Sequence, residues 1–206
     1  MRQKILPSIM AKNQKELNQD FKKLNGVVKH LHLDIVDGKF AKSKVMFFPF
    51  KLSKNFNYSA HLMIKNPEKW IKKNHKKIEL LIPQFEELKD FDNYLTFCKE
   101  NKKKVAIAIK PETKIKQIKN YLNKIDYVLV LTVHPGFYGA NFLPKQLKKI
   151  KQIKKINPKT KVIIDGGMNP KTIKKAKKAD HFVSGSYTTK SDNPKQRIKS
   201  LLQSIN

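Results

Sequence analysis

The chain has 206 residues, a length that suits one domain with a full hydrophobic core. Its single cysteine, Cys98, excludes an intrachain disulfide and fits a cytoplasmic location, and no apolar run approaches the length of a membrane span. The formal net charge is +29, but all the basic residues except Arg2 and Arg197 are lysines spread over nearly every helical segment. This spread favours solvated helix faces over a specific nucleic-acid site, although sequence-blind attraction to polyanions at low salt is expected.

Apolar runs of strand length alternate with amphipathic helical stretches along the whole chain. The pattern predicts strands near 4–9, 28–35, 58–63, 78–82, 104–109, 126–132, 161–165 and 181–184. It predicts helices near 13–25, 67–74, 87–101, 114–123, 143–156, 170–178 and 193–204, with a shorter connection at 41–55. Eight βα units are typical of an α/β fold of the (β/α)8 TIM-barrel type, here one domain over 1–206. An open doubly wound sheet is the alternative, but no Gly-x-Gly-x-x-Gly motif follows the first strand.

The second predicted strand shows how side chains divide between two faces. In the stretch 30–35, polar residues alternate with leucine and isoleucine. A period of two places the apolar side chains against the helices and points His32 and Asp34 into the barrel near its top. His30, about 6–7 Å lower for a two-residue step, is predicted to be an interior histidine rather than a ligand.

Polar residues or glycines follow the carboxyl end of every predicted strand, where the chemistry of barrel enzymes gathers. In chain order they are Ser8, His32 with Asp34, His61, Gln84 with Glu86, Lys110, His134 with the glycines after it, Asp165 with Gly166 and Gly167, and Ser184 to Ser186. Packing alone explains poorly why polar groups occupy the same level of every strand. Asp34 and Asp165 form a candidate acid/base pair, and His32 and His61 add nitrogen ligands for a divalent metal.

Glycines are concentrated after the last three predicted strands. Of the seven glycines in the chain, five lie there: Gly136, Gly139, Gly166, Gly167 and Gly185. Glycine lets backbone N–H groups approach an anion closely, so a phosphate site is predicted on this side of the barrel mouth. Ordinary turn glycines are the alternative.

These residues carry a resemblance to the ribulose-phosphate 3-epimerase family over essentially the whole chain. The matching stretches are Pro7-Ser8-Ile9, His32-Leu33-Asp34 with Asp37-Gly38, His61-Leu62-Met63, Ala108-Ile109-Lys110-Pro111, Thr132-Val133 with Pro135-Gly136-Phe137, Asp165-Gly166-Gly167, and Val183-Ser184-Gly185-Ser186. The resemblance implies a (β/α)8 barrel that interconverts D-ribulose 5-phosphate and D-xylulose 5-phosphate at C3. It also implies a homo-oligomer, either a dimer or a hexamer.

The resemblance further implies roles for individual residues. One divalent ion would bind His32, Asp34, His61 and Asp165, with Asp34 and Asp165 as the acid/base pair. Two histidines and two aspartates suit Zn²⁺, Fe²⁺, Mn²⁺ or Co²⁺. Substrate contacts are implied for Ser8, His61, Gly136, Phe137, Tyr138, Gly139, Asp165, Gly166, Gly167, Gly185 and Ser186.

The chain departs from the family pattern at several positions while keeping the metal and acid/base set. The family usually has Pro-Asn-Ile-Thr-Phe-Gly where this chain has residues 42–47, and Gln84 and Tyr138 replace a usual histidine and a glycine. These departures motivate an alternative substrate, another ketose phosphate such as a hexulose 6-phosphate. An alternative from a different class is a catalytically weak barrel that binds anions or nucleic acid through its lysines.

Overall fold

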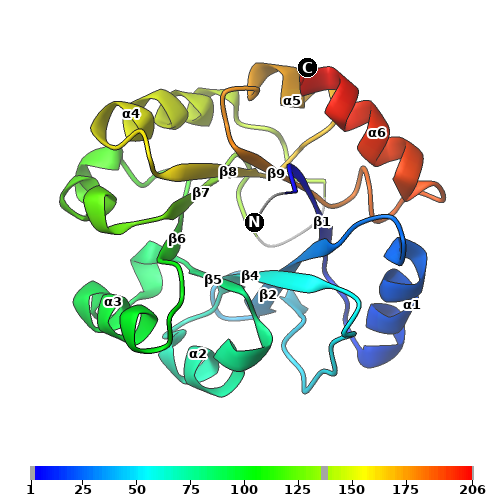
Figure 1. The fold of residues 1–206 in the computed structure, drawn as a ribbon, viewed down its shortest axis with the longest axis horizontal. Coiled ribbons are helices and arrows are strands. Elements are labelled where there is room, and N and C mark those ends of the chain that lie inside the picture. Colours follow the sequence, from blue (N-terminus) through cyan, green and yellow to red (C-terminus); the bar gives the residue numbers. More distant parts are fainter. Residues whose placement is uncertain (1–2, 136–138, 206) are drawn as a thin grey trace.

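Figure 1 shows strands that line the inside of a barrel, with helices around them. The computed structural model describes residues 3–135 and 139–205. The strands are β1 (Ile5–Ile9), β2 (His30–Asp37), β3 (Lys44–Val45), β4 (Asn57–Met63), β5 (Leu80–Pro83), β6 (Ala106–Ile109), β7 (Tyr127–Leu131), β8 (Lys161–Asp165) and β9 (His181–Ser184). The α-helices are α1 (Gln14–Leu24), α2 (Glu68–Asn74), α3 (Phe91–Glu100), α4 (Lys148–Ile156), α5 (Pro170–Lys175) and α6 (Pro194–Ile205).

Parallel pairing runs around the barrel in the order β5-β4-β2-β1-β9-β8-β7-β6. An isolated parallel bridge between Gln84 and Ala108 joins the two ends of this order, just beyond β5 and within β6. The short strand β3 lies off this path and pairs antiparallel with the end of β2. Eight parallel strands closed in this way confirm the predicted (β/α)8 fold class.

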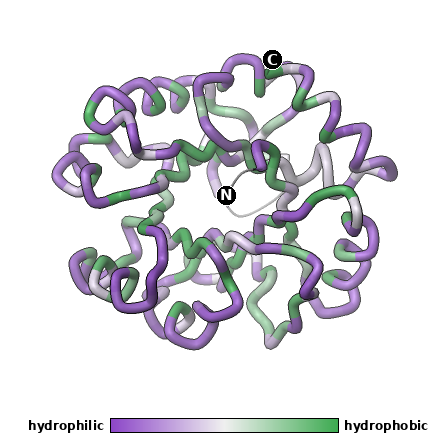
Figure 2. The backbone as a smooth tube through the Cα atoms, viewed as in Figure 1, coloured by the Kyte–Doolittle hydropathy of each residue, from purple (hydrophilic) through white to green (hydrophobic). Residues whose placement is uncertain are grey.

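Apolar side chains form one layer on each side of the barrel wall. The outer layer packs between strands and helices and includes Leu31, Leu33 and Ile35, as the period of two predicts. The inner layer is made of Leu6, Leu80, Ile82, Ala106, Ala108, Leu129, Leu131, Ile163 and Val183. Ser8 and Asp165 each lie two residues after a member of this inner layer, so they continue the inward face up to the barrel mouth. In Figure 2 the strands are mainly hydrophobic and the surrounding helices mainly hydrophilic.

Two connections differ from the predicted elements. The predicted helix 114–123 is replaced by the 3-10 helices η3 (Ile115–Gln117) and η4 (Lys119–Lys124). Its buried residues, Ile115, Ile118 and Leu122, still face the core, so the apolar stripe was predicted and the hydrogen-bond pattern was not. The connection 41–55, for which only a shorter connection was predicted, contains the short strand β3, which pairs with the end of β2.

The start of α3 is also later than predicted. The side chain of Asp90 accepts hydrogen bonds from the backbone N–H groups of Asp92 and Asn93, which caps the helix there. The preceding residues form the 3-10 turn η2 (Phe85–Glu87), which follows β5 directly. Further 3-10 turns are η1 (His75–Lys77) and η5 (Pro144–Leu147).

Asp180, the residue before β9, forms hydrogen bonds and ion pairs with residues of α4 and β8. It accepts a hydrogen bond from the Val162 N–H at 2.9 Å and pairs with Lys154 at 2.7 Å and Lys161 at 3.1 Å. Burial alone would raise the pKa of Asp180, but hydrogen bonds from Lys154, Val162 and Lys161 lower it below its ordinary value of 3.8.

We expect Asp180→Asn to lower the free energy of unfolding by about 1–3 kcal/mol, because two lysines lose their counter-ion. The stabilisation by a carboxylate with a lowered pKa is present above its unfolded-state pKa and is lost as pH falls through the folded-state value. The difference between wild type and variant in urea unfolding should therefore be constant above about pH 5 and shrink towards pH 3. The exposed Asp192→Asn serves as control and should change stability by less than about 0.5 kcal/mol. An equal loss at every pH would contradict the electrostatic explanation.

Candidate active site

Four side chains with metal-binding groups meet at the carboxyl ends of three strands. Asp34 on β2 is the register partner of His61 on β4, and His32 lies two residues before Asp34 on the same face. Asp165 reaches the group from the end of β8. One ligand atom from each of the four lies within 4.8 Å of the others. The sequence-predicted ligand set is thus brought together by three separate strands.

The atoms that face one another in this cluster lack ordinary hydrogen bonds. His61 Nδ1 lies 3.5 Å from Asp34 Oδ1 and 3.3 Å from Asp165 Oδ2, and His32 Nε2 lies 3.5 Å from Asp34 Oδ1. Among the described residues, His32 Nε2, Asp34 Oδ1 and His61 Nδ1 are buried without a hydrogen-bond partner. Buried polar atoms without a partner are costly, and a divalent cation among them would satisfy all three. The donor set therefore fits a metal ion.

The outward-facing atoms of the same side chains are held in place by neighbours. His32 Nδ1 lies 2.8 Å from the hydroxyl of Ser59, and His61 Nε2 lies 2.8 Å from the amide of Gln84. The hydroxyl of Ser8 donates a hydrogen bond to Asp34 Oδ2. These contacts leave one ring nitrogen of each histidine facing the cluster.

Carboxylate–imidazole pairs dominate the electrostatics of the cluster. Burial alone would raise the pKa of Asp34, but His32 and His61 lower it overall, below its ordinary value of 3.8. Burial alone would lower the pKa of His61, but Asp165 and Asp34 raise it to about 9. His61 Nδ1 has to be unprotonated to bind a cation, so the metal affinity of such a site would depend on pH.

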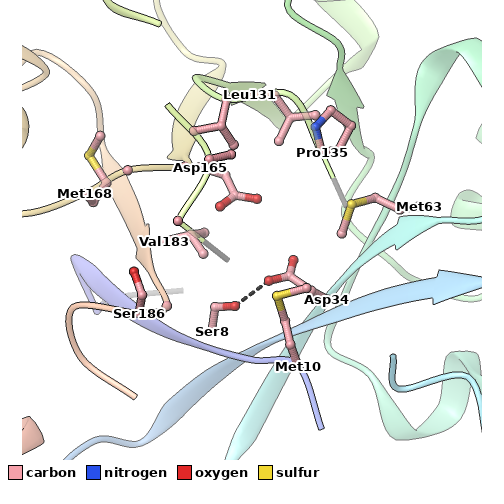
Figure 3. A pocket seen from close by; sticks show the side chains of 16 residues that line it. Ser8, Met10, Asp34, Met63, Leu131, Pro135, Asp165, Met168, Val183 and Ser186 are labelled. Carbon is pink, nitrogen blue, oxygen red and sulfur yellow. Dashed lines mark hydrogen bonds between the residues drawn. The ribbon is translucent and has the colours of Figure 1, made fainter. Parts of the chain in front are cut away.

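A pocket opens at the barrel mouth above the two carboxylates. Figure 3 shows Asp34 and Asp165 extending into it from different sides, with Ser8 hydrogen-bonded to Asp34. The predicted substrate residues that line it are Ser8, Gly139, Asp165, Gly166, Gly167, Gly185 and Ser186. His61 is fully buried and does not line this pocket. Gly136, Phe137 and Tyr138 lie outside the described residues.

The apolar part of the pocket was not predicted from the sequence. Met10, Met63 and Met168 line it together with Leu131 and Val133. Met10 lies two residues after Ser8, and Met63 lies two residues after His61, so the same period of two places them on the inward face. The signal that finds both residues is the alternation itself, continued to the last residue of β4 for Met63 and one residue beyond β1 for Met10.

Among residues 3–135 and 139–205, no helix combines the length and apolar character that a membrane crossing requires. The described structure is a closed parallel barrel with two carboxylates and two histidines at the carboxyl ends of its strands. This arrangement defines a (β/α)8-barrel protein with a group of two histidines and two aspartates at its mouth that could hold a metal ion. The sequence model of the Ribulose-phosphate 3 epimerase family matches residues 4–189. The chain therefore belongs to this family and is an isomerase acting on carbohydrates.

Relatives with this family name match nearly the full chain. The ribulose-phosphate 3-epimerase of Mycobacterium tuberculosis is 30% identical over 219 residues, covering 96% of this chain and 90% of the relative. That of Schizosaccharomyces pombe is 28% identical over 217 residues, covering 98% of this chain and 93% of the relative. The crystal structure of 3-keto-L-gulonate-6-phosphate decarboxylase from Vibrio cholerae matches 100% of this chain and 98% of its own, with a TM-score of 0.71 and 10% identity. This last similarity concerns the fold alone.

Proposed function

We propose that this chain interconverts D-ribulose 5-phosphate and D-xylulose 5-phosphate, with Asp34 and Asp165 as the acid/base pair. The observation that carries the proposal is the pair of carboxylates that extend into one pocket from different sides of the barrel. The epimerase names of the full-length relatives support the choice of substrate.

Epimerisation at C3 requires that a proton leave one face of the substrate and that another arrive on the opposite face. The proton alpha to the C2 ketone is removed by one carboxylate, which produces a planar enediolate. The second carboxyl group, protonated at the start, returns a proton from the other face. The two groups exchange roles in the reverse reaction, so the substrate does not have to turn over in the pocket.

His32, Asp34, His61 and Asp165 would hold one divalent ion, Zn²⁺, Fe²⁺, Mn²⁺ or Co²⁺. When bound, the ion supplies a positive charge that stabilises the oxyanion developing at C2. Three buried atoms of this cluster that lack hydrogen-bond partners, His32 Nε2, Asp34 Oδ1 and His61 Nδ1, support this assignment.

The remaining predicted residues suit the two ends of a phosphorylated ketose. Ser8 lines the pocket beside Asp34 and is placed to contact the sugar. Gly139, Gly166 and Gly167 have φ values of 82°, 113° and 67°, in the left-handed region that glycine tolerates best. With Gly185 and Ser186 they form the described part of the proposed phosphate site, to which Gly136, Phe137 and Tyr138 also belong.

A hexulose 6-phosphate is the second candidate substrate because the segment near residues 42–47 departs from the family pattern. Val45 of β3 packs against Val36 and Met63, and Met63 lines the pocket. The test is a substrate panel with metal-reconstituted protein whose metal content is measured. We expect kcat/KM for ribulose 5-phosphate to exceed that for the hexulose phosphate by at least about tenfold. The reverse order would favour the second candidate, and no turnover of either would favour an anion-binding barrel.

Gly166→Ala should lower kcat/KM by about 10–100-fold, because Gly166 adjoins Asp165 and has no room for a side chain. An added Cβ would lie 2.5 Å from Val133 Cγ2 at a φ of 113°. Gly26→Ala is the matched control, since Gly26 has a φ of 74° but nothing within 4 Å of the added Cβ. The control should lose only about 1–2 kcal/mol of stability and keep wild-type kinetics. If Gly166→Ala and Gly26→Ala had the same kcat/KM, the prediction that crowding at Gly166 disturbs the site would be wrong.

The lysines are proposed to act as a solvated shell and a weak steering field for anionic sugar phosphates, not as a specific nucleic-acid site. We expect kcat/KM to fall modestly with rising ionic strength while kcat changes little. DNA or RNA binding should be weak, blind to sequence and lost as salt rises. Tight, sequence-selective binding at physiological salt would contradict this prediction.

The proposed function also includes where the chain is located and how it assembles. We propose a cytoplasmic location and a homo-oligomer, a dimer or a hexamer. Sedimentation velocity measures the assembly directly, and a monomer at micromolar concentration would contradict it.

A further inference from the structure

Gln84 connects His61 to a chain of hydrogen bonds that lies behind the cluster of His32, Asp34, His61 and Asp165. Its side chain is fully buried, and its backbone closes the barrel against Ala108. In the register of β4 and β5, His61 pairs with Ile82, so Gln84 lies two residues further along the same face. Its amide reaches to 2.8 Å from His61 Nε2.

The neighbours of Gln84 determine which way its amide faces. The carbonyl oxygen of Ala108 and Oε2 of Glu86, both acceptors, lie 3.2 Å and 2.9 Å from the amide nitrogen in the orientation that satisfies every partner. The amide nitrogen donates to these two atoms, so the amide oxygen faces His61 Nε2 and accepts from it.

Glu86 is itself held by donors on its other oxygen. Its Oε1 accepts a hydrogen bond from the backbone N–H of Lys110 at 2.9 Å and another from the hydroxyl of Thr113. These bonds leave Oε2 facing the amide of Gln84. The orientation of Gln84 therefore depends on a carboxylate that is held by the loop after β6.

We propose that Gln84 is a positioning residue that keeps the Nδ1 lone pair of His61 directed at the metal site. Because Nε2 of His61 donates to the Gln84 oxygen, Nε2 carries the proton and Nδ1 is the nitrogen left for a cation. Nδ1 is also the nitrogen that faces Asp34 and Asp165. A hydrogen-bonded partner on the far nitrogen is the usual means of setting ring orientation and basicity in metal-binding histidines. The neutral amide does this without adding a third negative charge beside the two carboxylates.

The positioning role of Gln84 rests on the metal site of the proposed function. Ring ¹⁵N NMR of the Zn²⁺-loaded wild-type protein tests this role without a variant. We expect His61 to coordinate through Nδ1 and to carry its proton on Nε2. Coordination through Nε2 would overturn the inference.

Gln84→Met tests the same inference by affinity, with Zn²⁺ dissociation constants measured by competition against a chromophoric chelator. The variant removes the acceptor at similar size and should weaken Zn²⁺ binding by about 10–100-fold. Thr160→Val is the matched control, since it removes buried hydrogen bonds to the carbonyls of Leu122 and Ile125 and contacts neither Gln84 nor Glu86. It should lower the free energy of unfolding but change Zn²⁺ affinity by less than about threefold.

The outcomes separate the inference from the proposed function. Wild-type affinity in Gln84→Met would overturn the positioning role alone. Equal losses of affinity in Gln84→Met and Thr160→Val would assign the effect to a general loss of structure and also overturn the positioning role. A wild-type protein that binds no Zn²⁺, Mn²⁺, Co²⁺ or Fe²⁺ would overturn the metal site and the inference together.

Discussion

Replacing either Asp34 or Asp165 by asparagine should lower kcat for epimerisation by about 10²–10⁴-fold. An amide of nearly the same shape can neither accept nor return the C3 proton. The two variants should be measured with their metal content, because both carboxylates are also proposed metal ligands. Near-normal kcat in either variant would exclude that residue as acid or base.

Solvent isotope exchange distinguishes the roles of the two carboxylates. If each carboxylate serves one face of the enediolate, the variant that lacks one can still exchange the proton on the other face. In D₂O, Asp34→Asn should therefore incorporate deuterium at C3 of one epimer without forming the other, and Asp165→Asn should show the mirror pattern. Exchange of the same epimer by both variants would contradict the assignment to opposite faces.

Asp180→Asn is the matched control for both substitutions. Asp180 is a partly buried carboxylate that pairs with Lys154 and Lys161 and does not line the pocket. We expect this variant to keep wild-type kcat at temperatures where it is folded, so that loss of a carboxylate alone does not explain a loss of turnover.

Removing the divalent ion with a chelator should abolish nearly all turnover, and one equivalent of a suitable ion per chain should restore it. The reason is that the oxyanion at C2 loses its main electrostatic stabilisation. An effect on stability is also expected, because an ion that binds only the folded state adds about 2.7 kcal/mol at one hundred times its dissociation constant. Thermal unfolding with and without the ion measures this effect independently of activity.

Histidine variants provide the controls for the metal prediction. His61→Ala should lose the ion, because Nδ1 lies between Asp34 and Asp165. His181→Gln should keep it, because His181 is a buried histidine at the start of β9 whose Nδ1 contacts the carbonyl of Gln3. Full activity of a chelated, metal-free preparation would contradict the metal requirement.

The sequence by itself determined the fold class and the membership of the cluster. In a barrel strand with a period of two, one face meets the helices and the other the interior, so Leu33 and Asp34 have to point to opposite sides. The carboxyl ends of all parallel strands lie at the same rim of a barrel. Residues at the ends of β2, β4 and β8 are therefore expected to be close together even before the order of strand pairing is known. That is why the set His32, Asp34, His61 and Asp165 could be predicted.

Local hydrogen bonding was less predictable than the apolar pattern. The stripe of Ile115, Ile118 and Leu122 suits a helix of three or of 3.6 residues per turn, and in the structure it lies on two short 3-10 helices. Likewise β3 exists only because the end of β2 offers it a partner. The pairing partner is a property of the assembled barrel, not of residues 44–45.

Only the tertiary structure decided how the site residues are held. The hydrogen bond between His61 and Gln84 depends on the register of β4 against β5. The direction of the Gln84 amide depends on its contacts with Glu86 and with Ala108 of β6. A pattern of residue types records which side chains face inward, but it contains no distances between strands. Ring orientation, amide direction and the three buried atoms without partners follow from those distances, and they therefore appeared only once the barrel was closed.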